Sequence, residues 1–165
     1  MDTWGQSAGK KVAWLAGMID ADGCIGLHRQ PYKGKVHYVP DLSISTSCSR
    51  TREVIISLLH ELEIGCHVTA RKARDHDNWS VVWVIDVRGM KRVAKLARFI
   101  GDDLVTKKAE LSEVVKFIEL RQSQPKSVPY GQRENALKEQ IHWLKLNRNA
   151  SLPSETLRSA LNIVG

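Results

Sequence analysis

The chain has 165 residues, of which 42% are hydrophobic and 26% charged, proportions typical of a globular protein and unlike those of disordered or fibrous chains. Lys and Arg number 25 against 18 Asp and Glu, so the formal net charge of +7 predicts a polyanionic partner, with nucleic acid favoured over a membrane surface. No apolar run reaches membrane-spanning length, and residues 1–11 lack the apolar core of a signal peptide, so we expect no membrane association.

The cysteine content bears on the cellular compartment. Cys24, Cys48 and Cys66 are odd in number and widely spaced, which fits neither a disulfide framework nor the Cys-x-x-Cys pairs of a structural zinc site. We therefore expect an intracellular, reducing compartment. At this length, a single domain spanning residues 1–165 is expected.

Apolar residues spaced by about 3.6 positions predict a first helix that starts near Ser7 and ends in an Asp-rich turn. Ala13, Ala16 and Gly17 leave this helix with little side-chain bulk, so a second helix could approach it closely. Asp20 and Asp22 fall at the helix C-terminus, where the helix dipole disfavours anions and a divalent metal is the strongest candidate partner. Gly23, directly after them, is expected to adopt the left-handed conformation that ends many helices.

The later elements follow from alternation, helical spacing and turn residues. Strands are predicted at about 24–30 and 36–48, a helix at 51–63, a hairpin from 67–74 and 79–87, and helices at 89–100, 106–122, 132–146 and from Pro153 onward. The first six elements thus form a repeated helix-strand-strand unit. Lys107 and Lys108 lie at a helix N-terminus, where the dipole disfavours cations, so an anion such as phosphate is expected nearby.

Residues 15–23 read Leu-Ala-Gly-Met-Ile-Asp-Ala-Asp-Gly, which resembles the LAGLIDADG motif of homing endonucleases and departs from it only at Met18. The segment from Lys107 to Glu119 is similar to the helix that carries the catalytic lysine in single-motif members, and residues 154–161 are similar to their C-terminal helix. The resemblance implies an α+β fold. It has an αββαββα core at about residues 7–122, a saddle-shaped antiparallel four-stranded sheet, and extra C-terminal helices at about 131–163.

The resemblance also implies a function. Members of this family cut both strands of a long, partly palindromic DNA target by metal-dependent phosphodiester hydrolysis. A chain with one motif is expected to form a homodimer through Ala13, Ala16 and Gly17, and to use Mg²⁺ or another divalent cation such as Mn²⁺ or Ca²⁺. The alternative is a member that binds without cutting, either a group I intron maturase with intron RNA as its partner or a DNA-binding regulator.

The motif assigns roles to residues near the end of the first helix. By resemblance, Asp22 is the metal ligand, aided by the backbone carbonyl of Ala21. Asp20 is expected to be structural and to bind backbone groups in the turn. Lys107 would stabilise phosphate charge or polarise a water molecule. Arg52 matches a basic residue of the catalytic pocket, although a solvated arginine at a helix start is an equally good interpretation.

The end of the second predicted strand departs from the family. A Gln often positions pocket water there, and this chain offers Cys48, Ser49 or Arg50, of which Cys48 best fits the strand register. The same strands carry polar residues on alternate positions, which is the pattern either of a solvated sheet face or of a surface that reads base edges. On the second interpretation, the expected DNA contacts are His28, Gln30, Asp41, Ser43, Ser45, Ser47, Thr69 and Arg71. Phosphates, or simply solvent, are the expected partners of Lys33, Lys35, Lys72 and Arg148.

Overall fold

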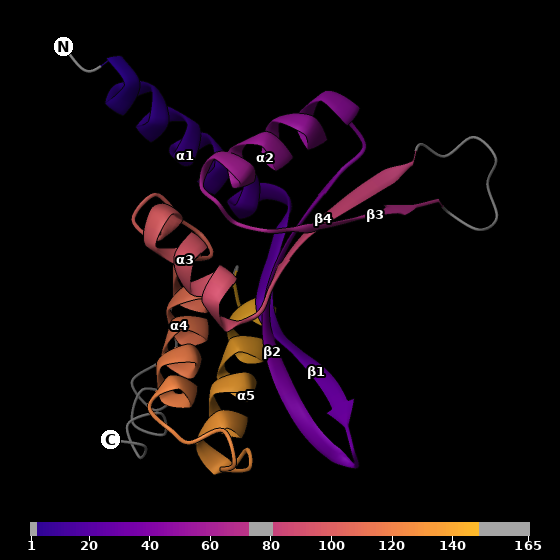
Figure 1. The fold of residues 1–165 in the computed structure, drawn as a ribbon, viewed down its shortest axis with the longest axis vertical. Helices are drawn as coiled ribbons and strands as arrows, with labels where there is room; N and C mark the ends of the chain where they lie inside the picture. The colour runs from indigo at the N-terminus through magenta and orange to yellow at the C-terminus, as the bar shows by residue number, and fades with distance from the viewer. Residues whose placement is uncertain (1–2, 73–80, 149–165) are drawn as a thin grey trace.

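The computed structural model describes residues 3–72 and 81–148, in which helices and strands follow one another in the predicted order (Figure 1). The elements are α1 (Thr3–Asp22), β1 (Gly23–Tyr32), β2 (Lys35–Thr46), α2 (Ser49–Glu61), β3 (His67–Arg71), β4 (Val82–Arg88), α3 (Met90–Ile100), α4 (Lys108–Gln122) and α5 (Gln132–Leu146). The final helix predicted from Pro153 lies outside the described residues. None of the helices in these two ranges has the length and apolar character needed to cross a membrane.

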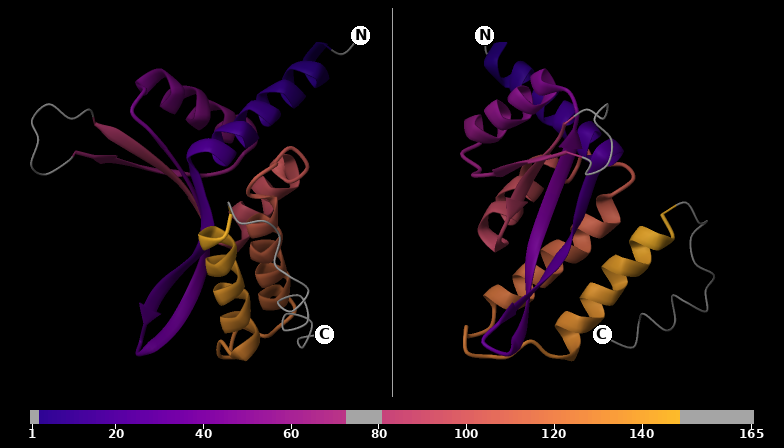
Figure 2. Two further views of the ribbon diagram at one scale, coloured as in Figure 1. Left: turned by 180° about the vertical axis from the view of Figure 1, so that it is seen from behind. Right: turned by 90° about the vertical axis from the view of Figure 1, so that its right-hand side faces the viewer.

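The four strands form one antiparallel sheet in the order β1-β2-β4-β3. It consists of two hairpins, β1–β2 and β3–β4, which are joined where residues 41–46 of β2 pair with β4. The hairpins diverge from this junction, so the sheet has a concave side that faces right in Figure 1, and the helices lie on the other side (Figures 1 and 2). The predicted α+β architecture with a saddle-shaped sheet is therefore confirmed.

Alternation along the strands decides which side chains enter the core. In β2, Tyr38, Leu42 and Ile44 are buried, whereas the odd-numbered residues between them are only partly buried. The buried side packs against α1 through Leu15 and Ile19, which are fully shielded from solvent. Burial of this apolar surface is the main force holding the helical layer on the convex side of the sheet.

The expected left-handed conformation at Gly23 is wrong. Among the described glycines, positive φ occurs only at Gly34 and Gly89, and Gly23 instead begins β1 directly. Glycine is required here for space, because a Cβ would lie 2.6 Å from the carbonyl oxygen of Ile19, closer than real Cβ contacts allow. The motif helix therefore passes into β1 without a loop, which places Asp22 next to the first residue of the sheet.

Two ion pairs, each with a buried carboxylate, attach α5 and the residues just after it to α4. The Arg121 Nη1 to Glu134 Oε1 distance is 2.9 Å with both side chains almost fully buried, and Arg148 Nη2 lies 2.9 Å from Glu110 Oε1. Buried charges need such partners, because an unpaired one would be strongly destabilising. The second pair fixes the C-terminal end of α5 beside the start of α4, close to the motif.

Candidate functional site

The motif helix delivers its last carboxylate to one end of the sheet. Asp22 is the final residue of α1 and is exposed. Gly23 pairs with Ile44, so Asp22 emerges beside the C-terminal end of β2, where Cys48 follows two residues after the strand. Among the described residues there is no group of three or more His, Cys, Asp or Glu side chains that could hold a metal ion within one chain.

Asp20 has a structural environment, in agreement with the role expected for it. Its carboxylate accepts hydrogen bonds from the backbone amides of Val105, Thr106 and Lys107 at 2.6, 3.2 and 3.0 Å, and from the Thr106 hydroxyl at 3.0 Å. Burial alone would raise the pKa of Asp20, but these hydrogen bonds outweigh it and lower the pKa. The amides belong to the segment before α4 rather than to the turn itself, so Asp20 joins the two parts of the chain.

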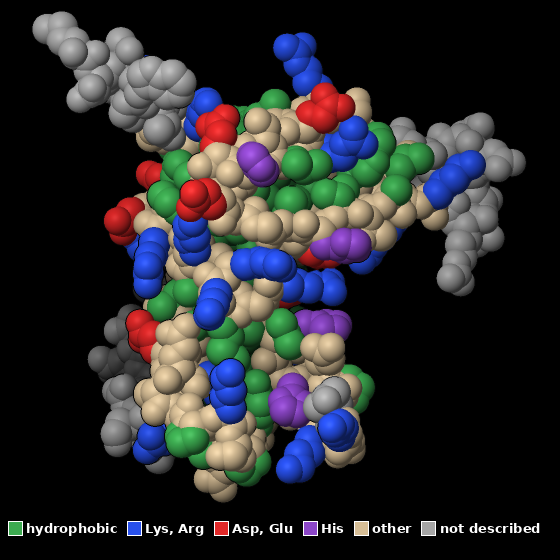
Figure 3. Space-filling model, in the orientation of Figure 1, with side chains coloured by type: hydrophobic (Ala, Val, Ile, Leu, Met, Phe, Trp, Pro, Cys, Tyr) green, Lys and Arg blue, Asp and Glu red, His purple; other side chains and the backbone are tan. Residues whose placement is uncertain are grey.

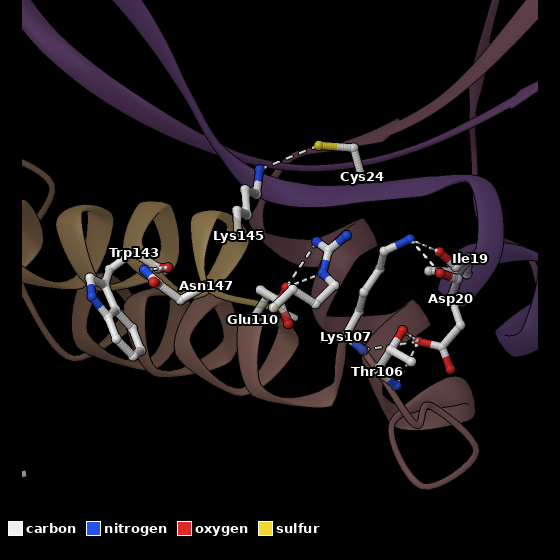
Figure 4. A network of polar contacts seen from close by, with 10 residues as sticks. Ile19, Asp20, Cys24, Thr106, Lys107, Glu110, Trp143, Lys145 and Asn147 are labelled. Atoms are coloured by element: carbon white, nitrogen blue, oxygen red, sulfur yellow. Dashed lines mark hydrogen bonds and ion pairs between the residues drawn. The ribbon is translucent and has the colours of Figure 1, made fainter. Parts of the chain in front are cut away.

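Lys107 lies immediately beside the end of the motif. Its side chain is 2% exposed, and Nζ donates to the backbone carbonyls of Ile19 and Asp20 at 2.7 and 2.6 Å (Figure 4). Burial lowers the pKa of Lys107, and the Arg148 guanidinium lowers it further. The negative partner expected for Lys107 is thus supplied, in the free chain, by the carbonyl end of α1, where the helix dipole favours a cation.

Cys48 and Arg52 lie at the start of α2. Cys48 is exposed at the N-cap position, and the nearby Thr51 hydroxyl and amide lower the pKa of its thiol. The Arg52 guanidinium lies 4.5 Å from the Trp83 ring centroid, and its Nη2 is 3.1 Å from Glu53 Oε1. Trp83 pairs with Thr46 on the convex side of the sheet, so Arg52 occupies a shallow pocket between α2 and the β3–β4 hairpin and not the concave surface.

Strand register places most of the predicted DNA contacts on one surface. Gly26 pairs with Asp41, Ser45 with Val84, and Thr69 with Val84, so these positions point to the same side, opposite the buried Leu42 and Ile44. We call this side the reading face. From the predicted set it carries His28, Gln30, Lys35, Asp41, Ser43, Ser45, Thr69 and Arg71, whereas Ser47 and Lys72 follow the ends of β2 and β3 and Lys33 lies in the β1–β2 turn.

The reading face also carries charged residues that sequence reasoning missed. Arg88 pairs with Asp41 in the register, and Asp86 with Ser43. Arg88 Nε lies 3.5 Å from Asp41 Oδ2, and its Nη2 lies 3.4 Å from Asp86 Oδ2. Burial raises the pKa of Asp41, and the Arg88 charge opposes that rise. Residues of β4 also alternate between the two sides of the sheet, but only the β2–β4 register shows which of the two alternating sets lies on the reading face.

Lys145 is a third missed residue, because it comes from a helix on the other side of the sheet. Its Nζ lies 3.3 Å from Cys24 Sγ (Figure 4). A Cβ at Gly26 would approach that nitrogen to 2.6 Å. The absence of a side chain at Gly26 therefore lets the ammonium lie across edge strand β1. No spacing in the sequence connects α5 with β1.

Two predicted assignments need correction. Arg148 is held against Glu110, with its Nε 2.9 Å from Glu110 Oε1, and therefore serves to neutralise a buried carboxylate rather than to extend from the reading face. Ala16, assigned to the dimer interface, is 0% exposed and lies in the core of its own chain. Ala13 and Gly17, four residues apart, share the exposed side of α1, and Ala16 is turned away from it by the 100° step between helical neighbours.

The surface charge follows the same geometry. In the space-filling view, Lys, Arg and His side chains gather along the hollowed right-hand side, between the β3–β4 and β1–β2 hairpins (Figure 3). The concave shape, the hydrogen-bonding residues along the strands and this positive surround together suit a curved polyanion.

Comparisons with known proteins agree with this architecture. The family model described as LAGLIDADG-like domain matches residues 9–101. A search of curated protein sequences found no match. Among solved structures, the homing endonuclease I-CvuI, bound to the I-CreI target with the DNA not cleaved, is similar at 21% identity, with a TM-score of 0.65 over 96% of this chain and 97% of that one.

Other structures show the same fold in one-domain and longer chains. The homing endonuclease I-TnaI has 17% identity and a TM-score of 0.52 over 93% of this chain and 97% of its own. I-GzeII in complex with its DNA target has 18% identity and a TM-score of 0.56, and its match covers 92% of this chain but 48% of that one. Since the family model spans more than half of the sequence and the architecture agrees throughout, this chain belongs to the LAGLIDADG family and has the fold of its homing endonucleases.

Proposed function

We propose that this protein is a site-specific DNA endonuclease that works as a homodimer and hydrolyses phosphodiester bonds with the help of a divalent cation. The observation that carries the proposal is the placement of Asp22. It is an exposed carboxylate at the end of the motif helix, directly beside a concave, polar and positively surrounded sheet. The neighbouring proteins that were solved with DNA share the fold of this chain.

The oxygens at the end of α1 fit a hard divalent cation. The Asp22 carboxylate and the Ala21 backbone carbonyl are the kinds of ligand that Mg²⁺ and Ca²⁺ prefer, and I-CvuI was solved in the presence of either ion. When bound, such a cation neutralises the charge that develops on the phosphate and activates a water molecule. Asp22 would hold it, and DNA phosphates and the same residue of a second chain would complete its coordination.

The remaining residues act through position and charge. Lys107 places an ammonium beside the last carbonyls of α1, from which it can stabilise the phosphate or orient water when DNA arrives. Asp20 fixes the segment that carries Lys107 through its amides. The exposed small-residue side of α1, around Ala13 and Gly17, would pack on a second copy, which brings two Asp22 carboxylates close to the two strands of the duplex.

One observation favours a second candidate function. Cys48 stands where the family often has a Gln, and a thiol is a weak hydrogen-bonding group that orders water poorly. A chain that binds DNA or intron RNA without cutting would tolerate this change. The intact Asp22 and Lys107 support the endonuclease instead.

Cleavage of a selected target tests the proposal. The wild-type protein is used to select duplexes from a randomised library, and the winners are then incubated with Mg²⁺ or with EDTA. We expect double-strand breaks only with Mg²⁺. In Asp22→Asn, which removes the charge but keeps the size, we expect cleavage to fall by about 100-fold or more while binding is kept.

A nearby acidic residue provides the matched control. Asp103→Asn, in the exposed loop before α4, should cut at the wild-type rate. Selective binding without any cleavage by the wild-type protein would favour the non-cleaving function. Equal cleavage by Asp22→Asn would show that Asp22 is not the metal ligand.

A further inference from the structure

The two hairpins of the sheet meet at a cluster of charged side chains whose arrangement goes beyond general DNA binding. Asp41 and Asp86 lie on β2 and β4, and Arg88 lies between them on the reading face. Acidic residues are unexpected on a surface that meets a polyanion, because each carboxylate repels phosphate. Their presence at the centre of this face therefore calls for a specific role.

The three side chains differ in how far they are buried. The Asp86 side chain is 6% exposed and that of Asp41 is 18% exposed, whereas that of Arg88 is 47% exposed. The carboxylates are thus recessed, and the guanidinium is the part that a ligand can reach. Two carboxylates bound to one guanidinium restrict its rotamers before any ligand arrives, which lowers the entropy cost of binding.

The contacts also leave the useful end of the guanidinium accessible. The two ion pairs involve Nε and Nη2, and neither uses Nη1. A guanidinium has five N–H donors, so the two terminal nitrogens can still donate together to a pair of acceptors. Guanine presents such a pair, O6 and N7, in the major groove, and bidentate Arg–guanine contact is the commonest specific one.

The charge balance argues against a phosphate site. The titratable groups that face Asp41 are Arg88, Asp86, His28 and, from α5, Lys145. Two carboxylates and the two permanent cations cancel, whereas a phosphate site would need a surplus of positive charge. A neutral array of donors and acceptors is suited to base edges, where cytosine N4 can donate to a carboxylate.

The backbone holds the cluster at the junction of the hairpins. The Gly89 amide donates to the Pro40 carbonyl at 2.9 Å, and Gly89 has a φ of 96°, a conformation that glycine adopts without strain. The end of β4 is thereby fixed to β2 on both sides of the Asp41–Arg88 pair. We propose that Arg88, held by Asp41 and Asp86, is a specificity-determining residue that reads a guanine in each half of the DNA target.

This inference rests on the proposed function, since it names part of the sequence that the endonuclease would recognise. Arg88 is the residue that contacts the base, and Asp86 is a positioning residue that acts through it. Because Arg88 lies between the hairpins, its base pair should fall between those read from the β1–β2 hairpin around Gln30 and from the β3–β4 hairpin around Arg71.

Binding selection tests the assignment. Wild type, Arg88→Lys and Asp86→Asn are each used to select from a randomised double-stranded DNA library in EDTA, so that no metal-dependent cleavage occurs, and the base preferences are compared. Arg88→Lys keeps the charge but loses the fork, so it should reduce a G·C preference by about 10-fold at two mirrored positions. Asp86→Asn should weaken the same two positions, although its side chain is too recessed to be a main contact.

Controls separate reading from stability. Arg98→Lys, an exposed residue of α3 on the convex side, should leave every position unchanged. Thermal unfolding of each variant shows whether it is folded, and Arg88→Lys alone suffices if Asp86→Asn does not fold. If Arg88→Lys selects the same base preferences as wild type, the assignment of Arg88 is wrong, but the proposed endonuclease function is unaffected. If the wild-type protein selects no sequence, both the assignment and the proposed function are wrong.

Discussion

The end of α1 and the reading face are both polar and both lie close to the proposed DNA path, yet they are built differently. At the end of α1, Asp20 accepts four hydrogen bonds and Lys107 donates two. In each of these bonds the partner belongs to a distant part of the chain. On the outer part of the reading face, Thr69 and Arg71 are exposed on a five-residue strand with no buried position.

This difference teaches where change is tolerated. A side chain that joins two segments cannot be replaced without moving both, so substitutions at the end of α1 should affect catalysis and folding. An exposed side chain on a strand can be exchanged with little effect on the fold, so substitutions on the reading face should alter only the preferred sequence. The end of α1 would thus perform the same hydrolysis on every target, while substitutions on the reading face would change which target is bound.

A substitution on the exposed side of α1 should have the largest effect on cleavage. A Cβ at Gly17 would meet nothing within 4 Å in the chain itself, so Gly17→Leu should leave the protomer folded. If this side packs against a second copy, the added bulk should separate the chains and abolish double-strand cleavage. The mass measured by light scattering should then fall from twice 18.6 kDa, the value for a dimer, to 18.6 kDa, the value for one chain. Arg98→Leu, which adds an apolar side chain at an exposed position of α3 on the convex side, should remain a dimer.

Lys107→Met should give the next largest effect. We expect cleavage to slow by about 100-fold, the contribution typical of a positioned proton-transfer or charge-stabilising group, with little change in DNA affinity. The melting temperature should also fall, because Met cannot donate the two hydrogen bonds that join the start of α4 to the end of α1, although the cost of burying the ammonium, reflected in the lowered pKa of Lys107, offsets part of their contribution. Lys108→Met, on an exposed neighbour, is the matched control. Normal cleavage by Lys107→Met would leave Lys107 a purely structural residue.

Asp20→Asn should reduce stability by about 1–2 kcal/mol at neutral pH, since the amide cannot replace all of the charge-assisted hydrogen bonds. The folded pKa of Asp20 lies below its ordinary value of 3.8, so its contribution is present above about pH 4 and is lost as the pH falls through the folded pKa. Unfolding midpoints measured between pH 7 and about pH 3 should therefore converge for wild type and Asp20→Asn. Parallel curves would contradict the assigned role of this carboxylate.

Arg71→Ala should produce the smallest change and confine it to recognition. The exposed arginine stands at the end of β3, opposite Val82, and is expected to contact a guanine. Its removal should cost about 1–3 kcal/mol at one base pair of each half-site and leave the melting temperature unchanged. Selection from a randomised library measures this. An altered preference in one half-site alone would argue against a symmetric dimer.

Local patterns in the sequence determined most of the fold. Helical spacing and alternation placed all the described elements in the correct order, with α5 at its observed bounds, because these periodicities reflect which side of an element is buried. The Asp-Ala-Asp-Gly string at the end of α1 predicted a structural role for Asp20, which agrees with its hydrogen bonds to the segment before α4, and a metal-ligand role for Asp22, which stays a prediction. Alternation also assigned His28, Ser43 and Arg71 to one face.

Tertiary structure decided whatever depends on residues far apart in the chain. The pairing of β2 with β4 joined Asp41 to Arg88 and Asp86, and the docking of α5 brought Lys145 over Gly26 and Arg148 onto Glu110. Packing also moved Ala16 from an expected interface into the core. A periodic pattern shows whether a side chain faces the core or the solvent. Its partners depend on the distances between elements, which only the assembled fold defines.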